Sequence, residues 1–318
     1  MINNKNNVEK IIHNGKLIKK LNVINNVNNE AYLYRWLDDR YVVRKIGKQY
    51  NLSIKELVVL EKDICIYYKL LKKHLSINLP KIFLTTIDKK QNTILLVTEY
   101  FPKGKVVDIK TISQKVKYFK NIVELIIKLA SSKNNLYSNN LICSIDPNPN
   151  NFFIDSKNQL IYNDFTPPLY RKNGKWFEFR RWDELHAKKS DKKKRYFTGF
   201  NLLLVFINKT RTYLAFSNYL KFVEGLSNQI QKYDLSNNNI AKFPEVFKDV
   251  LLKKVVDFSK LEKYAVSRDL LRFALSFRED LTSSQIKEIY KKSKGLDGIK
   301  ILTKKLYEEN KSSNSGVR

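Results

Sequence analysis

The stretch SIDPNPNNFFIDSKNQLIYNDF, residues 144–165, stands out from the Lys-, Asn- and Ile-rich chain around it. Asp146 opens the spacing D-x-x-x-x-N, which ends at Asn151, and two prolines between them exclude a helix. Two short apolar segments joined by the polar residues SKNQ follow, and the second leads into Asp164. This pattern predicts a tight β-hairpin. Asn151 and Asp164 are then expected about one strand separation, roughly 5 Å, apart.

These three side chains carry the oxygen groups that phosphoryl transfer to an alcohol requires. Asn151 offers a neutral carbonyl oxygen and Asp164 a carboxylate. Mg²⁺ prefers a few such hard oxygens while nucleotide phosphates complete its coordination. Asp146, on the loop before the hairpin, is placed to accept a proton from an attacking hydroxyl. Each residue taken alone also fits an ordinary Asn/Pro surface turn, but their order and spacing favour the metal–phosphate interpretation.

Residues 16–101 mix strand-like and helix-like patterns. β-Branched and aromatic residues predict strands, with a hairpin that turns at Asp38 and Asp39. A segment with helical periodicity follows, and two further strands complete the region. The strands are expected within residues 16–24, 30–47, 81–88 and 93–101, and the helix within 53–75.

The strand RYVVRKIG supplies a candidate cation for the phosphates. Lys45 lies on the same face as Val43, because side chains alternate along a strand. A lysine in this role needs a carboxylate to orient it, and the following helix contains two candidates. Glu56 stands three residues after Ser53 and matches a capping box, so Glu61 is the favoured partner of Lys45.

A change in character near residue 101 predicts two lobes. Glu99, Tyr100 and Phe101 end a buried strand in an extended stretch whose backbone is expected to hydrogen-bond an adenine ring. From residue 111 the pattern is mostly helical apart from the predicted hairpin. The expected division is a small β-rich N-lobe, a larger helical C-lobe and a polar tail. These cover residues 1–101, 102–310 and 311–318 respectively.

The composition narrows the class of protein. A chain of 318 residues with 43% hydrophobic residues has room for two lobes with cores. No apolar run is long enough to span a bilayer, and MINNKNNVEK lacks the apolar region of a signal peptide. Cys65 and Cys143 lie in apolar surroundings and are expected to be buried free thiols, so we expect a reducing, cytoplasmic location.

The net charge of +29, from 60 basic and 31 acidic residues, attracts polyanions such as nucleotide phosphates, nucleic acid or an anionic membrane surface. The basic residues are dispersed, and no zinc-finger, helix-turn-helix or RNP pattern accompanies them. The charge therefore leaves nucleic acid open as a partner without favouring it over a small molecule.

Taken together, these motifs resemble the protein-kinase-like fold, in the branch of the aminoglycoside phosphotransferases and choline kinases. That branch carries a loop HGDxHPGN, followed by a hairpin to a second Asp. SIDPNPNN aligns with the loop without a gap: Asp146 falls on the catalytic Asp and Asn151 on the metal-binding Asn. Asp164 matches the second metal-binding Asp, and Lys45 the lysine that binds ATP phosphates. Glu61 matches that lysine's ion-pair partner more loosely, and residues 99–101 match the hinge.

The resemblance covers roughly residues 16–200 and has three departures, one of which is Thr166 in place of the Gly of DFG. Ser144 stands where the family usually has His, and the segment expected to cover the nucleotide, residues 23–32, contains no Gly. The resemblance implies an α+β, bilobal phosphotransferase that uses ATP, or another nucleoside triphosphate, with Mg²⁺. Its acceptor would be a hydroxyl of a small molecule of antibiotic, sugar, amino-alcohol or nucleoside type, because no protein-kinase APE segment follows Asp164.

Two alternatives remain open at this point. One is a catalytically weak, pseudokinase-like nucleotide-binding module, which Ser144 and the glycine-free segment would suit. The other is a kinase whose acceptor is a polyanion such as RNA or an anionic glycolipid, which the positive charge would suit.

Overall fold

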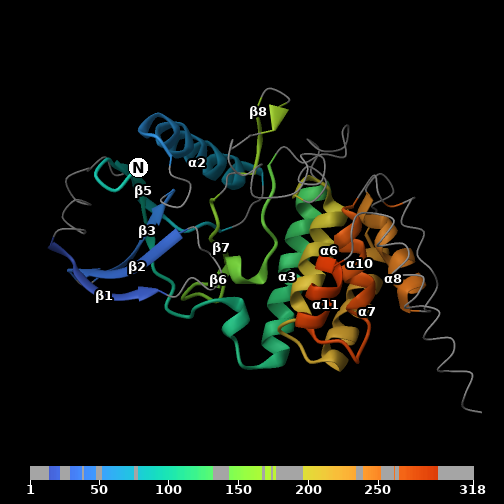
Figure 1. Ribbon diagram of the computed structural model, residues 1–318. Helices are drawn as coiled ribbons and strands as arrows, with labels where there is room; N and C mark the ends of the chain where they lie inside the picture. The colour runs from blue at the N-terminus through green and yellow to red at the C-terminus, as the bar shows by residue number, and fades with distance from the viewer. Residues whose placement is uncertain are drawn as a thin grey trace, which may run out of the picture. The chain divides into compact units, whose positions relative to one another are not determined.

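The chain is α+β: an antiparallel five-stranded sheet with a helix comes first, and a mainly helical region follows (Figure 1). Its atoms divide into two compact units. Unit 1 comprises Met1–Lys105 and Phe152–His186, and unit 2 comprises Val106–Asn151 and Ala187–Arg318. The structure, a computed structural model, describes residues 14–21, 29–37, 39–47, 52–74, 78–131, 143–166, 169–172, 175–176, 196–233, 239–251, 261 and 265–292.

The sheet of unit 1 has the strand order β1-β2-β3-β5-β4, and every neighbouring pair is antiparallel. The predicted succession of three strands, one helix and two strands is confirmed. The strands are β1 (Lys16–Leu21), β2 (Asn29–Trp36), β3 (Asp39–Ile46), β4 (Ile82–Asp88) and β5 (Thr93–Glu99).

The turn between β2 and β3 lies one residue earlier than predicted. Asp39 pairs with Trp36 and already belongs to β3, so the connection between the two strands begins at Leu37. Leu37 adopts a positive φ of 54°, which type I′ hairpin turns require of both central residues. The prediction missed this register because acidic residues favour turns locally, whereas the pairing of the whole strand sets the position of the turn.

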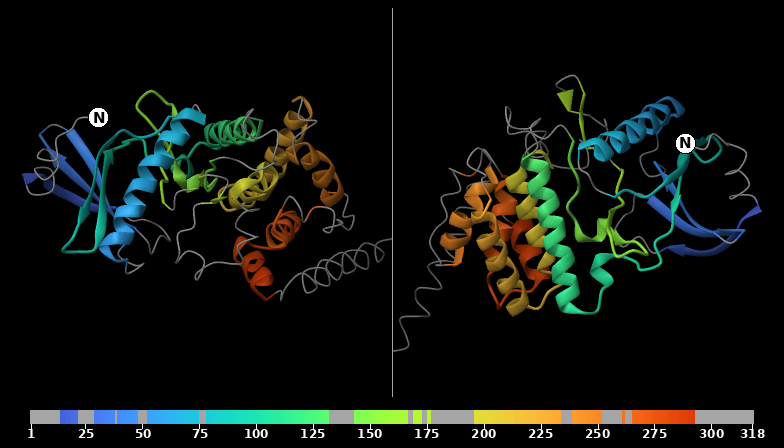
Figure 2. Two further views of the ribbon diagram at one scale, coloured as in Figure 1. Left: turned by 90° about the horizontal axis from the view of Figure 1, so that it is seen from above. Right: turned by 180° about the vertical axis from the view of Figure 1, so that it is seen from behind.

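Helix α2 (Ile54–His74) begins with the predicted capping box. The Ser53 backbone N–H donates to Glu56 Oε2 over 2.8 Å, and the Glu56 N–H donates to Ser53 Oγ over 3.3 Å. The helix lies beside the sheet and contacts β4 and β5 (Figures 1 and 2). Its buried side chains are those of Leu57, Leu60, Asp63, Ile64, Tyr67 and Leu71.

The predicted hairpin at residues 152–162 is present in unit 1. Strand β6 (Phe152–Ile154) pairs antiparallel with β7 (Leu160–Tyr162), with Phe152 opposite Tyr162. The carboxylate of Asp155 closes the turn by accepting the backbone N–H groups of Lys157 and Gln159. A short pair, β8 (Arg171–Lys172) and β9 (Lys175–Trp176), follows.

Unit 2 is helical, as predicted, and its helices α3, α6, α7, α8, α10 and α11 pack together (Figure 2). Aromatic rings fill the interior; Phe119, for example, meets Phe206 and Phe222 edge-to-face. The α-helices are α3 (Ile112–Ser131), α6 (Gly199–Thr210), α7 (Phe216–Gln231), α8 (Phe243–Leu251), α10 (Ser267–Leu275) and α11 (Ser283–Lys292). Short 3₁₀ turns are η2 (Val106–Asp108), η4 (Pro149–Asn151) and η5 (Asn239–Lys242).

Two predictions about the whole chain concern the boundary between lobes and membrane-spanning segments. The first segment of unit 1 ends at Lys105, close to the expected boundary at residue 101, but residues 152–186 group with the N-terminal sheet. Asp164 therefore belongs to the unit that contains β3 and α2. Among the described helices, none combines the length and the apolar character that a bilayer span requires.

Candidate functional site

The D-x-x-x-x-N loop folds back on itself within unit 2. Asp146 Oδ1 accepts the Asn148 backbone N–H over 3.1 Å, which is an Asx turn. Asn151 Nδ2 donates to the backbone carbonyl of Asp146 over 3.2 Å. Because an amide that donates through Nδ2 presents its Oδ1 on the opposite side, this bond orients the Asn151 carbonyl oxygen. The two residues at the ends of the motif are thus tied together by short-range bonds.

Ser144, two residues before Asp146, anchors the same loop. Its side chain is fully buried, and Oγ donates to the backbone carbonyl of Tyr196, just before α6. The apolar neighbours Cys143 and Ile145 are buried beside it. Ser144 thereby connects the start of the loop to the segment that leads into α6, which is a structural role that requires no imidazole.

Tyr213, between α6 and α7, also holds this loop, and sequence reasoning missed it. Asn150 Nδ2 donates to the Tyr213 hydroxyl over 2.5 Å. Burial, assisted by the negative charge of Asp108, raises the pKa of Tyr213 above its ordinary value, although the bond from Asn150 opposes the shift. The hydroxyl therefore stays protonated at neutral pH. No local pattern could have paired residues 63 positions apart.

Asp164 lies just after β7 in unit 1, in an Asx turn of its own. Its Oδ1 accepts the Thr166 backbone N–H over 3.2 Å. Phe165 is fully buried and meets the ring of Tyr68 on α2 edge-to-face at 5.6 Å. The buried Phe165 ring and the turn together fix the direction in which the Asp164 backbone runs.

Arg44 on β3 is the cation that the structure brings to Asp164. Its Nη1 donates to the backbone carbonyl of Asn163 over 3.0 Å. Burial lowers the pKa of the Arg44 guanidinium, and the negative charge of Asp164 opposes that shift. Because arginine stays protonated in proteins, a positive charge is held beside Asp164. The sequence contained one signal for this role, since Arg44 directly precedes Lys45 in the same strand.

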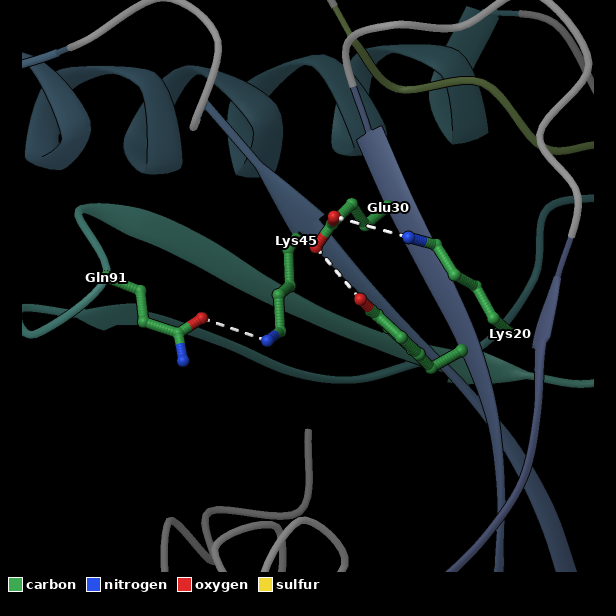
Figure 3. Close-up of polar contacts among 5 residues, drawn as sticks. Lys20, Glu30, Lys45 and Gln91 are labelled. Carbon is green, nitrogen blue, oxygen red and sulfur yellow. Dashed lines mark hydrogen bonds and ion pairs between the residues drawn. The ribbon is translucent and has the colours of Figure 1, made fainter.

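Lys45 lies on the other face of β3, because consecutive residues of a strand point to opposite sides. Its Nζ donates to Gln91 Oε1 over 2.9 Å and sits 5.3 Å from the centre of the Tyr32 ring. Figure 3 shows Lys45 with Gln91, near the ion pair between Glu30 and Lys20. Lys45 thus shares the face of Val43, as alternation required, and Arg44 shares the face of Val42.

Helix α2 carries three carboxylates: the capping residue Glu56, the predicted partner Glu61 and Asp63. Across the described part of the chain, the contacts of Lys45 lead to Gln91 and Tyr32, with no bond to Glu61. Glu61, within the first half of α2, is half-buried. The buried carboxylate is that of Asp63, which accepts the hydroxyl of Tyr170 over 2.5 Å. The Lys45–Glu61 pair therefore stays a prediction without support from these contacts.

The predicted hinge continues the sheet. The Glu99 backbone N–H donates to Lys81 O over 3.2 Å, and Glu99 Oε1 accepts the Lys81 N–H over 2.9 Å. Tyr100 packs on an aliphatic cluster formed by Ala31, Leu33 and Val42. Phe101 is buried, with its ring centre 5.9 Å from that of Phe153. Because Val42 and Arg44 share a face of β3, Tyr100, the aliphatic cluster and Arg44 lie on one face of the sheet.

The remaining predictions concern the metal and the covering loop. Over the described ranges there is no group of three or more His, Cys, Asp or Glu side chains that could hold a metal ion. Asn151 and Asp164 supply hard oxygens of the kind that suits Mg²⁺, which keeps several non-protein ligands. Most of the predicted nucleotide-covering segment, residues 23–28 of 23–32, lies outside the described residues. Comparison with models of protein families and with curated proteins found no match.

Proposed function

We propose that this chain is an ATP- and Mg²⁺-dependent phosphotransferase that phosphorylates a hydroxyl group of a small molecule. Its fold would be the protein-kinase-like fold of the aminoglycoside phosphotransferase and choline kinase branch. The protein would act in the cytoplasm. The observation that carries the proposal is the loop from Asp146 to Asn151, where the Asn151 amide donates to the Asp146 backbone carbonyl. The α+β order of a five-stranded sheet followed by helices supports it.

Asp146 would act as the base. Its Oδ1 is held by the Asn148 N–H, so the carboxylate has a defined orientation. The acceptor's oxygen would form a bond to the γ-phosphorus, the bond from that phosphorus to the leaving diphosphate would break, and the acceptor's proton would pass to Asp146. Asn151 and Asp164 would hold Mg²⁺, which supplies electrostatic stabilisation of the phosphate oxygens when bound.

We further propose that Arg44, in place of the sequence-predicted Lys45, faces the nucleotide phosphates. Arg44 has the negative charge of Asp164 beside it and shares a sheet face with the cluster that packs on Tyr100. A planar guanidinium can bind phosphate oxygens bidentately, which a lysine cannot. The backbone of Glu99 to Phe101 would then bind the adenine ring.

The test is turnover of labelled ATP with a panel of antibiotics, sugars, amino alcohols, nucleosides and RNA. Asp146→Asn should lower turnover by about 10³-fold or more while leaving nucleotide affinity within a few-fold. Asp164→Ala should abolish metal-dependent nucleotide binding. Asp249→Asn on α8 makes the same charge change away from the loop and should leave both unchanged. Unaltered turnover in Asp146→Asn would refute the mechanism.

The same assay separates the alternatives. Metal-dependent ATP binding without transfer to any acceptor would identify a nucleotide-binding module. Transfer to RNA alone, with binding that weakens steeply as salt increases, would identify a polyanionic acceptor. Comparison of Arg44→Met with Lys45→Met assigns the phosphate cation: we expect the first to weaken nucleotide binding at least tenfold, and a larger loss in the second would restore Lys45 to that role.

A further inference from the structure

Helix α2 carries a continuous basic stripe on the side opposite its buried face. All five of its lysines are exposed, and at 100° per residue four of them, Lys55, Lys62, Lys69 and Lys73, lie within about 40° of one another. From the first to the last lysine the stripe spans 18 positions, about 27 Å along the helix axis. These four residues are called here the α2 lysine stripe, and Lys72 points about 100° away from Lys73.

No carboxylate compensates this stripe from within α2. Glu56 lies at the N-terminus and is bound in the capping box with Ser53. Asp63 is buried and accepts the hydroxyl of Tyr170. Glu61 is half-buried and, at 100° per residue, points about 100° away from Lys62. Within the described residues, none of the four lysines of the stripe forms an ion pair.

Aliphatic side chains are exposed among these lysines. Val58 and Val59 are 51% and 56% exposed, and they lie between Lys55 and Lys62 along the helix. Ile66 follows on the same side and is half-buried. Both valine side chains are exposed to water in the free protein. Burying them against a partner would therefore be favourable. The face is therefore both strongly basic and partly apolar.

The basic and aliphatic residues of this face favour one of two polyanionic partners, a nucleic acid or an anionic bilayer. A nucleic-acid surface would use arginine, aromatic or amide side chains to stack on or read bases. The stripe contains none of these, only lysines and aliphatic residues. Lysines that extend to phosphate head groups, with short aliphatic residues entering the interface between them, are typical of a helix that lies on an anionic bilayer.

We propose that the exposed face of α2 binds to an anionic lipid bilayer. The α2 lysine stripe would contact lipid phosphates, and Val58 and Val59 would enter the head-group region. This inference does not depend on the proposed phosphotransferase activity, since it requires neither nucleotide nor acceptor. If both proposals hold, the protein would work beside a membrane surface.

The experiment is co-sedimentation of the full chain with phosphatidylcholine vesicles that contain or lack phosphatidylglycerol, at low and at high salt. We expect binding only to the anionic vesicles. The triple variant Lys62→Gln/Lys69→Gln/Lys73→Gln should lower the partition coefficient by about 100-fold, because each lysine near such a surface contributes roughly a factor of five. Val58→Ser/Val59→Ser should lower the partition coefficient by about tenfold. It should also reduce the fraction of binding that persists at high salt.

The matched control changes three exposed lysines on α3 of unit 2, as Lys117→Gln/Lys120→Gln/Lys128→Gln. It removes the same net charge but from outside the α2 lysine stripe. We therefore expect its partition coefficient to fall by less than about threefold. Equal losses in the two triple variants would overturn the proposal in favour of net charge alone. Stripe-dependent binding to RNA or DNA without vesicle binding would also overturn it. Circular dichroism spectra equal to that of the parent chain establish that each variant is folded.

Discussion

Gly199, the first residue of α6, should tolerate no side chain. A Cβ at this position would lie 2.6 Å from the Cβ of Ala130 on α3 and 2.9 Å from Cδ1 of Ile240 in η5. Ordinary carbon–carbon contacts are about 3.5–4.0 Å, so the backbones of α3 and α6 would have to separate by roughly 1 Å. Overpacking of this kind costs about 1–3 kcal/mol, and we expect Gly199→Ala to destabilise unit 2 by about 2 kcal/mol.

Gly225 is the matched control, because the same substitution there should have the opposite sign. It lies inside α7, and apart from its chain neighbours and the backbone of its own helix a Cβ at this position would have no atom within 4 Å. Replacing glycine by alanine in a helix interior stabilises the helix by about 0.5–1 kcal/mol, since alanine loses less conformational entropy on folding. The two variants should therefore differ by about 3 kcal/mol in the free energy of unfolding.

Urea unfolding followed by two probes measures this difference. All three tryptophans, Trp36, Trp176 and Trp182, belong to unit 1, so their fluorescence reports on that unit. Far-ultraviolet circular dichroism reports mainly on helices, and most of the helices that the structure describes are in unit 2. The midpoint by circular dichroism should fall in Gly199→Ala and rise in Gly225→Ala. A Gly199→Ala midpoint equal to that of the parent chain would refute the close packing of α3 on α6.

Two further predictions test buried groups. Asn201→Ala should cost about 2–3 kcal/mol in unfolding experiments, because the Asn201 side chain bonds both the Asp269 carboxylate and a backbone N–H before α10. Asn208→Ala should cost less, since Asn208 makes one such bond and its Oδ1 has no partner among the described residues. Burial raises the pKa of the Cys143 thiol to about 12, so iodoacetamide at mildly alkaline pH should alkylate the half-buried Cys65 first, as peptide mass spectrometry would reveal. Preferential alkylation of Cys143 in the folded chain would contradict its burial.

Local patterns predicted much of the fold. The order of strands and helix in unit 1, the capping box of Ser53 and Glu56, and the hairpin from Phe152 to Tyr162 were all readable from short stretches. Each depends on interactions between residues that are near in sequence or on a simple period of two or 3.6 residues. The turn before Asp39 was misplaced by one residue because strand pairing, which is not local, sets its position.

The candidate site combines both kinds of information. The spacing from Asp146 to Asn151 and on to Asp164 was visible in the sequence, and the loop bonds around Asp146 and Asn151 are short-range. Sequence missed Tyr213, which binds Asn150 across 63 positions, and the bond from Ser144 to Tyr196. Such pairs form because separate helices and loops pack together, which no local pattern records.

The choice between two adjacent cations illustrates this division most clearly. Alternation along β3 determined that Arg44 and Lys45 point to opposite faces of the sheet. It could not determine which face receives the chain at Asn163 and Asp164, because that segment lies more than a hundred residues away. A period of two separates the faces of a strand, but only the packing of distant segments gives each face its neighbours. The sequence therefore determined the alternation, and the tertiary structure decided that Arg44 is the cation beside Asp164.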